Sequence, residues 1–508
     1  GYGRDVSRFA EQKRSVRDKD IGPLISTDMT RCIHCTRCVR FGEEICGMPE
    51  LGTLGRGEDM EIGTFVEQSV DHELSGNNID LCPVGALNSR PFRFRARNWE
   101  MQQVATVSAH DCLGSNLYAH VKNGKWLRTV PRPNDAINET WISDRDRFAY
   151  EGLQAEDRLT QPMRQWEGVW RSLDWRDGLD AAAKIMRSAA QVDQLGFWVS
   201  SSTTCEEGWL LSELTKFLGC THIDYQLRQI DHELTPSIRH TPYLGDSLTD
   251  FENHDAMVLV GSQLRTEVPM LAHRVRQAAL KGCAVMTVSP IDDTYYFPVT
   301  DRLSYAERGL LSTWAGVAAA VRDLTGRDLP DAWLALGSTT VTDTHRAIAQ
   351  RLIDAERPAI VLGLLANADM QLNRVRAVTE WIAEATQANI AALSPGANSL
   401  GLQSLLGRDA GRRWRAMLGD EQSVVVLFGV EPEGDAAWSS EIKDQLTAAR
   451  VIAITPYLSD AMREYVDIAL PLTPYAETAG SFVNALGNWQ SFPAVMPPMG
   501  ESKPGWKV

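Results

Sequence analysis

Residues 255–290 read DAMVLVGSQLRTEVPMLAHRVRQAALKGCAVMTVSP, and their apolar pattern indicates the fold class. Residues 255–262 and 283–290 are short apolar runs of the kind found in buried strands. Residues 266–282, between them, carry the pattern of a helix. A strand, a helix and a second strand in succession predict a βαβ unit, in which the two strands lie parallel in one sheet.

The same alternation extends over much of the chain. Further apolar strands are predicted at 193–201, 357–364, 422–430 and 449–456, and a helix at 204–219. Alternating strands and helices predict doubly wound parallel sheets. Residues 104–150 differ, since they read as β-rich and contain a hairpin turn at Asn123-Gly124.

Composition limits the classes of function. The 508 residues are too many for one core, and 44% hydrophobic with 23% charged residues is an ordinary soluble composition. The net charge of −15 argues against nucleic acid as a partner. No apolar run reaches about 18 residues, so no transmembrane helix is predicted, and no signal peptide is visible. The chain does not begin with Met, and we expect both ends to be cut from a longer protein.

Nine cysteines are present, and their positions are uneven. They lie at 32, 35, 38, 46, 82, 112, 205, 220 and 283. Disulfides in a secreted protein of this length would be spread more evenly, and an odd number would leave one thiol over. Clustered cysteines in a reducing compartment indicate metal ligands.

The stretch RCIHCTRCVRF (31–41) spaces Cys32, Cys35 and Cys38 by two residues each, and Cys82 is followed at once by Pro83. A compact triplet with a remote Cys-Pro is the pattern of a [4Fe-4S] site. In ferredoxins with two clusters the Cys-Pro thiolate serves the other cluster. No second complete triplet exists here, so Cys82 is assigned to the same cluster.

Structural zinc is the alternative, but zinc sites usually present two cysteine pairs or a cysteine pair and a histidine pair. Two neighbouring residues are further candidates for ligands. Cys46 has the wrong spacing and is predicted to be a buried thiol, and His34 is predicted to be an outward polar residue.

Three arginines flank the triplet and are predicted to surround the cluster: Arg31, Arg37 and Arg40. Positive charge near a negative cluster favours its reduced form. The alternative is that they only pair with Glu43 and Glu44.

Three segments, GPLISTDMTRCIHCTRCVRFGEEI (22–45), ELSGNNIDLCPVGAL (73–87) and PFRFRARNWE (91–100), resemble the large iron-sulfur subunits of respiratory complex I, the NADH-quinone oxidoreductase of bacteria. The part downstream resembles the molybdopterin oxidoreductases. The resemblance implies an α/β protein with four parts. They are a remnant of an upstream His/Cys3 cluster segment (1–20), a [4Fe-4S] domain (21–100), a β-rich domain without its own cluster (101–160) and a molybdopterin-oxidoreductase-like α/β region (161–508).

The resemblance also implies a set of cofactors. A [2Fe-2S] cluster and a His/Cys3 [4Fe-4S] cluster belong to the family's upstream part, and their ligands do not occur here. Related molybdenum enzymes carry a four-cysteine cluster in the part that corresponds to 101–160, where this chain has only Cys112. No cysteine is placed as a molybdenum ligand, because Cys205 and Cys220 are better explained as core thiols. We therefore expect one [4Fe-4S] cluster and no molybdopterin.

The function that the resemblance implies is an electron relay in NADH:quinone oxidoreductase. NADH would be oxidised on a flavin-bearing partner, electrons would pass through this chain towards quinone-proximal iron-sulfur subunits, and residues 161–508 would be a scaffold. The chain would lie on the cytoplasmic face of the bacterial inner membrane, or on the mitochondrial matrix face, with no direct span. The sequence contains no G-x-G-x-x-G nucleotide motif at a strand–helix turn.

Two alternatives are enzymes. A molybdenum-dependent formate dehydrogenase would need a metal-ligating cysteine and an intact second cluster domain. The diaphorase part of a hydrogenase would continue into a catalytic domain with many more cysteines than Cys205, Cys220 and Cys283.

Overall fold

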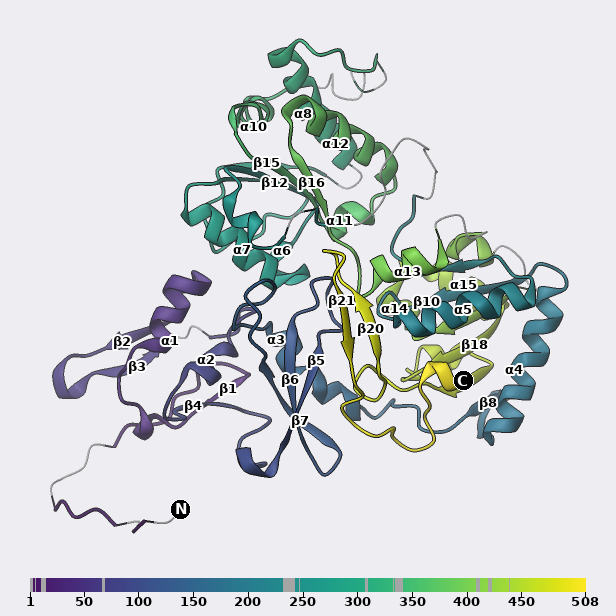
Figure 1. Cartoon of the computed structure of the whole chain (residues 1–508), viewed down its shortest axis with the longest axis horizontal. Coiled ribbons are helices and arrows are strands. Elements are labelled where there is room, and N and C mark those ends of the chain that lie inside the picture. Colours follow the sequence, from purple (N-terminus) through teal and green to yellow (C-terminus); the bar gives the residue numbers. More distant parts are fainter. Residues whose placement is uncertain are drawn as a thin grey trace. The chain divides into compact units, whose positions relative to one another are not determined.

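The computed structural model describes the chain except residues 1–2, 5, 11–14, 66–68, 232–242, 246, 307–308, 332, 334–340, 408–411, 419–422 and 438. The chain divides into two compact units, residues 1–100 and residues 101–508 (Figure 1). In the described part of the chain, no helix is both long enough and apolar enough to cross a membrane.

The first unit is built on two short antiparallel strand pairs. Strand β1 (Ile25–Thr27) pairs with β4 (Leu87–Ser89), and β2 (Leu51–Leu54) pairs with β3 (Glu61–Thr64). Two short helices lie between the strands in the sequence: α1 (Arg37–Arg40) follows β1, and α2 (Asn77–Leu81) precedes β4. The apolar core consists of Ile21, Ile25, Met29, Val39, Leu51, Ile62, Val70 and Leu87. The strand pairs form this core by bringing together apolar residues that are distant in the sequence.

The second unit begins with a three-stranded antiparallel sheet of β5 (Gln102–Val107), β6 (Asn116–Lys122) and β7 (Lys125–Pro131). The hairpin predicted at Asn123-Gly124 is confirmed, since Lys122 pairs with Lys125. Both turn residues have positive φ, 52° for Asn123 and 72° for Gly124. Two-residue hairpins favour this conformation because it matches the twist of the strands.

A five-stranded parallel sheet follows further along the chain. Its order is β14 (Asp301–Ser304), β13 (Ala284–Ser289), β12 (Ala256–Val260), β15 (Pro358–Leu362) and β16 (Asn389–Ala392). Three helices cover one face: α8 (Leu310–Thr325), α10 (Asp343–Asp354) and α12 (Leu372–Thr386). Figure 1 shows α7 (Pro269–Leu280) on the other face. The βαβ unit predicted over 255–290 is confirmed, with its helix broken before Pro269 because proline starts a helix but cannot continue one.

A seven-stranded sheet is the larger of the two main sheets in the second unit. Its order is β11 (Ile223–Asp224), β10 (Leu195–Val199), β17 (Val424–Phe428), β18 (Arg450–Thr455), β19 (Ile468–Pro471), β8 (Met163–Trp166) and β9 (Val169–Ser172). The first five strands are parallel, and β8 and β9 add an antiparallel edge.

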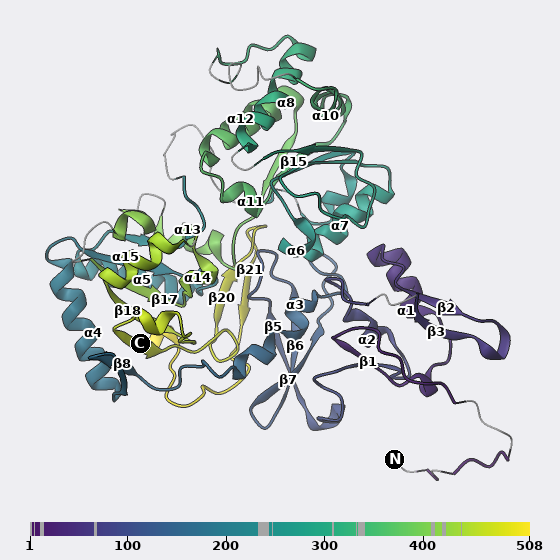
Figure 2. The same ribbon diagram turned by 180° about the vertical axis from the view of Figure 1, so that it is seen from behind.

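Helices bury both faces of this sheet, which is the usual state of a parallel sheet. Helices α4 (Trp175–Ala190), α5 (Cys205–Leu218) and α13 (Ser399–Leu406) contribute to the core on one face, and α15 (Ser440–Ala448) to the core on the other (Figure 2). Strands β10 and β17 pair directly although residues 200–423 lie between them. The five-stranded sheet is therefore an insertion into the seven-stranded one. The predicted doubly wound α/β fold is confirmed.

The C-terminal hairpin of β20 (Gly480–Val483) and β21 (Trp489–Phe492) packs on the three-stranded sheet. Phe482 and Phe492 lie in one apolar cluster with Val107, and Met496 lies in another with Trp126. Residues from the end of the chain thus complete the core of the β-rich region.

Candidate metal centre

The pairing of β1 with β4 brings two cysteine-bearing loops together. Thr27 is opposite Leu87, and the Asp28 N–H donates to the Ala86 carbonyl at 2.8 Å, which extends the ladder by one bond. Cys32 lies shortly after β1 and Cys82 shortly before β4. This short ladder therefore brings Cys82 close to the triplet in space, although the two are far apart in the sequence.

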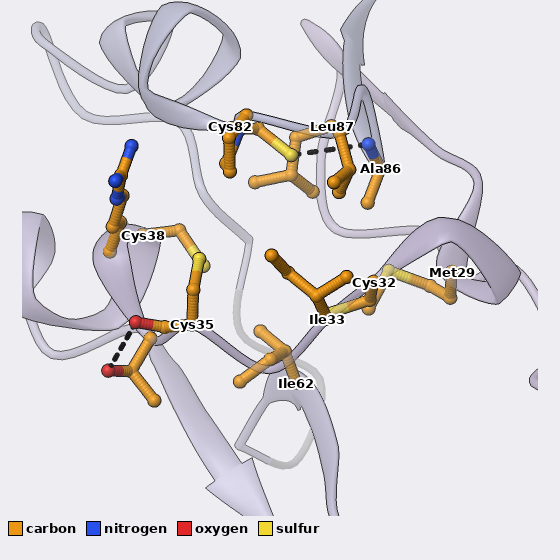
Figure 3. Close-up of a pocket in the computed structure, with 13 residues that line it drawn as sticks. Met29, Cys32, Ile33, Cys35, Cys38, Ile62, Cys82, Ala86 and Leu87 are labelled. Atoms are coloured by element: carbon orange, nitrogen blue, oxygen red, sulfur yellow. Dashed lines mark hydrogen bonds between the residues drawn. The ribbon is translucent and has the colours of Figure 1, made fainter.

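The four cysteines of the predicted site line one pocket. Figure 3 shows Cys32, Cys35, Cys38 and Cys82 around it. The remaining wall is mainly apolar and comes from Met29, Ile33, Ile62, Pro83, Val84, Ala86 and Leu87, with Thr36 and Arg37. Cys35 is exposed, and the other three cysteines are half-buried.

The triplet loop turns sharply between its cysteines. His34 and Thr36 have φ values of 54° and 59°, the left-handed region that side chains other than glycine seldom adopt. These turns aim backbone N–H groups at sulfur: the His34 N–H donates to the Cys32 Sγ at 3.5 Å. Successive N–H groups in such a loop make a concavity suited to negative charge.

The Cys82 segment reaches the pocket by a different route. Helix α2 ends at Leu81, and Pro83 cannot continue it because it lacks an N–H. Gly85 has a φ of 66°, and the Ala86 N–H donates to the Cys82 Sγ at 3.2 Å. Hydrogen bonds to cluster sulfurs are one means by which a protein sets the reduction potential.

Burial and the neighbouring sulfurs disfavour the thiolate form of Cys38 in the absence of a metal. Burial raises the pKa of the Cys38 thiol to about 11, and the charges of Cys32, Cys82 and Cys35 add to the effect. Four thiolates are therefore unfavourable together unless positive metal compensates them. Thiolates are the ligands that iron-sulfur clusters use, so this donor set fits a [4Fe-4S] cluster.

In the residues that the structure describes, no three or more His, Cys, Asp or Glu side chains converge closely enough to hold one metal ion. The four-cysteine pocket is a different kind of site, since each thiolate of a cubane binds its own iron.

The three flanking arginines are placed differently from one another. Arg31 pairs with Asp28 at 2.7 Å, and Arg40 pairs with Glu44 at 2.9 Å, and neither lines the pocket. Arg37 lines the pocket and has no ion pair in the described part of the chain. The alternative that the arginines only pair with Glu43 and Glu44 thus holds for Arg40, whereas Arg31 pairs with Asp28.

The other candidate ligands lie elsewhere. Cys46 is only 4% exposed and does not line the pocket, nor does His34. Cys205 and Cys220 are core thiols, as predicted: their Sγ atoms contact the Asn398 Oδ1 at 3.4 Å and the Leu195 carbonyl at 3.0 Å. Cys112 is buried in the β-rich region, and burial raises the pKa of its thiol to about 12.

Sequence reasoning missed several contributors to the pocket, among them Ile62 and Gly85. Ile62 comes from the β2–β3 hairpin, which carries no cysteine signal. Gly85 supplies the turn after Cys-Pro, and its position three residues after Cys82 was the only available sign.

Comparison with known proteins first defines the class. Residues 158–508 match the family described as molybdopterin oxidoreductase. The acetylene hydratase from Pelobacter acetylenicus has a similar fold, with a TM-score of 0.62 at 12% identity over 80% of this chain and 68% of that one. At this identity the likeness concerns the fold alone. Residues 158–508 of the second unit thus form an α/β region of molybdopterin-oxidoreductase type.

Two further matches narrow the class. Residues 22–88 match the ferredoxin-like domain of NADH-quinone oxidoreductase subunit 3, and residues 101–151 match the NADH-ubiquinone oxidoreductase NDSU1/NuoG-like 4Fe-4S domain. The chain belongs to the NuoG-like family, which includes the 75 kDa and 78 kDa subunits of NADH-ubiquinone oxidoreductase.

Three relatives illustrate the match. The NADH-ubiquinone oxidoreductase 75 kDa subunit from Reclinomonas americana is 30% identical over all of this chain and 70% of its own length. The mitochondrial 78 kDa subunit from Candida albicans is 31% identical over all of this chain and 66% of its own. The NADH-quinone oxidoreductase G-type subunit from Rickettsia bellii is 39% identical over 55% of this chain and 41% of its own. The matched parts thus span 41% to 70% of the length of these relatives.

Proposed function

We propose that this chain is an electron-relay subunit of an NADH:quinone oxidoreductase. The main observation behind this proposal is that one mostly apolar pocket is lined by Cys32, Cys35, Cys38 and Cys82. These four residues would hold one [4Fe-4S] cluster, which when bound supplies reversible one-electron transfer.

The chain's own residues are suited to that task. Four protein thiolates leave no iron site open for a substrate. The cluster would therefore transfer electrons and would not catalyse a reaction of a bound substrate. Ile62 and Leu87 keep water away from one side, and the N–H groups of His34 and Ala86 offset negative charge on sulfur. Arg37 at the wall favours the reduced state electrostatically. Arg31 and Arg40 act less, because carboxylates offset their charge.

The proposal includes partners and a place in the cell. NADH would be oxidised on a flavin-bearing subunit, and electrons would leave towards quinone-proximal iron-sulfur subunits. The [2Fe-2S] and His/Cys3 [4Fe-4S] centres of the family would belong to a segment outside residues 1–508. The chain would attach through other peripheral-arm subunits to the cytoplasmic face of the bacterial inner membrane, or to the mitochondrial matrix face.

We infer further that residues 161–508 are a scaffold without molybdopterin and that residues 101–160 hold no second cluster. The match over 101–151 is to a domain named for a 4Fe-4S cluster, but Cys112 is the one cysteine in that range. A single thiolate cannot hold a cubane. The proposed parts 1–20, 21–100, 101–160 and 161–508 are four in sequence, and the hairpin β20–β21 ties the last two together.

Metal analysis of the purified chain tests the proposal. Anaerobic protein should contain about four irons per chain, no molybdenum and no zinc, and dithionite should produce one reduced [4Fe-4S] EPR signal. About eight irons would show a second cluster, and stoichiometric molybdenum would favour a formate-dehydrogenase-type enzyme. Stoichiometric zinc without iron would reject the relay.

Deletion of residues 101–508 tests the scaffold. The first unit has its own apolar core, so the truncated chain should keep its EPR signal but fail to assemble with partner subunits. A cut at residue 161 would be less clean, because it removes β20–β21 from the β5–β7 sheet. Normal assembly of the truncated chain would contradict the scaffold role.

A further inference from the structure

The loop after Cys82 contains one peptide unit that is hydrogen-bonded at both ends. Its N–H belongs to Ala86 and donates to the Cys82 Sγ at 3.2 Å (Figure 3). Its carbonyl belongs to Gly85 and accepts a hydrogen bond from the Asn88 Nδ2 at 2.7 Å. In a trans peptide the N–H and the carbonyl point in opposite directions. The Asn88 amide therefore holds this peptide unit from the side that faces away from the sulfur.

The backbone does not by itself fix the orientation of this unit. Gly85 has a φ of 66°, and glycine adopts positive and negative φ about equally readily. The next peptide unit is fixed separately, because the Ala86 carbonyl accepts from the Asp28 N–H at 2.8 Å. The end of the β1–β4 ladder thus restrains the peptide after Ala86, and the Asn88 side chain restrains the peptide before it.

Strand pairing fixes the position of Asn88 itself. Asn88 lies in β4 opposite Ser26 of β1, and the Ser26 Oγ donates to the Asn88 carbonyl at 3.2 Å. The side chain of Asn88 therefore reaches the cysteine loop from a paired strand, and its backbone and its amide make separate contacts.

The hydrogen bond to the Gly85 carbonyl also changes the donor strength of the N–H on the same peptide. Hydrogen bonds in a chain polarise one another, so the Ala86 N–H becomes a stronger donor to sulfur. A donor to a cluster sulfur offsets negative charge, and the reduced cluster is the more negative state. Asn88 is neutral and adds no net charge of its own.

We propose that Asn88 is a positioning residue for the cluster. Its amide orients and polarises the Gly85–Ala86 peptide unit, which directs the N–H at the Cys82 sulfur and raises the reduction potential. The inference rests on the proposed function, since it assigns Asn88 a role towards the [4Fe-4S] cluster proposed there.

Hydrogen exchange of Asn88→Ala tests the restraint in the full chain as purified. Without the amide the peptide unit can rotate, so the Ala86 N–H should exchange about tenfold faster, measured by mass spectrometry with fragmentation to single residues. Ser26→Ala is the matched control, because it removes a hydrogen bond to the same residue but leaves the bond from Nδ2 to Gly85. Unchanged exchange in Asn88→Ala, or equal acceleration in Ser26→Ala, overturns the proposal.

Redox titration followed by EPR measures the effect on the cluster. At the potential where half of the wild-type cluster is reduced, the ratio of reduced to oxidised cluster in Asn88→Ala should fall about fivefold, a midpoint about 40 mV lower at about 59 mV per tenfold. Ser26→Ala should keep the wild-type ratio. An unchanged ratio in Asn88→Ala, or the same fall in Ser26→Ala, contradicts the effect on potential.

Iron content decides the remaining case. If Asn88→Ala loses its iron, with or without loss of protection in β1 and β4, the proposal is also overturned, because Asn88 would then serve folding or iron binding and not the potential. If the wild-type chain has no reduced [4Fe-4S] signal, the relay function itself fails. If that signal is present and Asn88→Ala changes neither readout, only the role of Asn88 fails.

Discussion

Replacing Cys82 by serine is expected to abolish the cluster altogether. Cys82 lines the pocket from the loop between α2 and β4, and the other three lining cysteines all come from the triplet loop. Serine keeps the size of the side chain but loses the thiolate that iron requires. Iron should fall from about four per chain to near zero, the EPR signal should vanish, and electron transfer from NADH to quinone in the assembled complex should stop.

Cys46→Ser is the matched control. Cys46 lies in the same unit and is buried, but it does not line the pocket. The control should retain its iron and its EPR spectrum, and Cys112→Ala in the second unit should do the same. Loss of the cluster in Cys46→Ser, or full iron in Cys82→Ser, would mean that the fourth ligand was assigned wrongly.

Replacing Arg158 by methionine is expected to destabilise the second unit strongly. Arg158 Nη2 donates to Glu477 Oε2 at 2.7 Å, and the two side chains are 3% and 0% exposed. Removing one partner leaves a buried carboxylate whose charge is no longer compensated, which costs about 3–5 kcal/mol. Urea unfolding followed by tryptophan fluorescence should show this loss in the free energy of unfolding.

Two comparisons make that result specific. Arg322→Met breaks an ion pair with Asp323 whose side chains are 34% and 49% exposed, and it should cost about 0–1 kcal/mol. The double variant Arg158→Met/Glu477→Leu should recover most of the loss, because the unpaired charge is gone. A double variant no more stable than Arg158→Met would contradict the ion-pair explanation.

The pH dependence of the same variant has a defined sign. Burial raises the pKa of Glu477, and Arg158 opposes that rise. Without Arg158 the folded-state pKa rises further. A carboxyl with a raised pKa contributes stability at low pH that is lost as pH rises through that pKa. Arg158→Met should therefore be destabilised more at pH 8 than at pH 5. An equal loss at both pH values would contradict this account.

Local patterns in the sequence were sufficient to predict six of the strands in the two large parallel sheets. Apolar runs such as 255–262 and 422–430 became β12 and β17, because a strand buried on both faces must be apolar throughout. The spacing of Cys32, Cys35 and Cys38 was also informative by itself, since a short loop carries all three thiols. Cys82 lines the same pocket in the structure, and its role as the fourth ligand stays a prediction.

The state of individual residues around the pocket could not be predicted in this way. Arg31, Arg37 and Arg40 look equivalent in sequence, yet two are paired and one lines the pocket. Which of them pairs with a carboxylate in the described part of the chain depends on where Asp28 and Glu44 come to lie. The exposure of Cys35 likewise follows from the packing of the other three cysteines against the core.

The sequence by itself therefore determined the fold class, the four candidate ligands and the family resemblance, because these depend on residue type and short-range spacing. Only the tertiary structure decided that β10 pairs with β17 across residues 200–423, that β20–β21 completes the core of the β5–β7 sheet, and that Arg158 meets Glu477. These contacts join residues far apart in the chain. Such contacts form where two buried surfaces are complementary. A local sequence pattern does not specify which distant segment supplies the complementary surface.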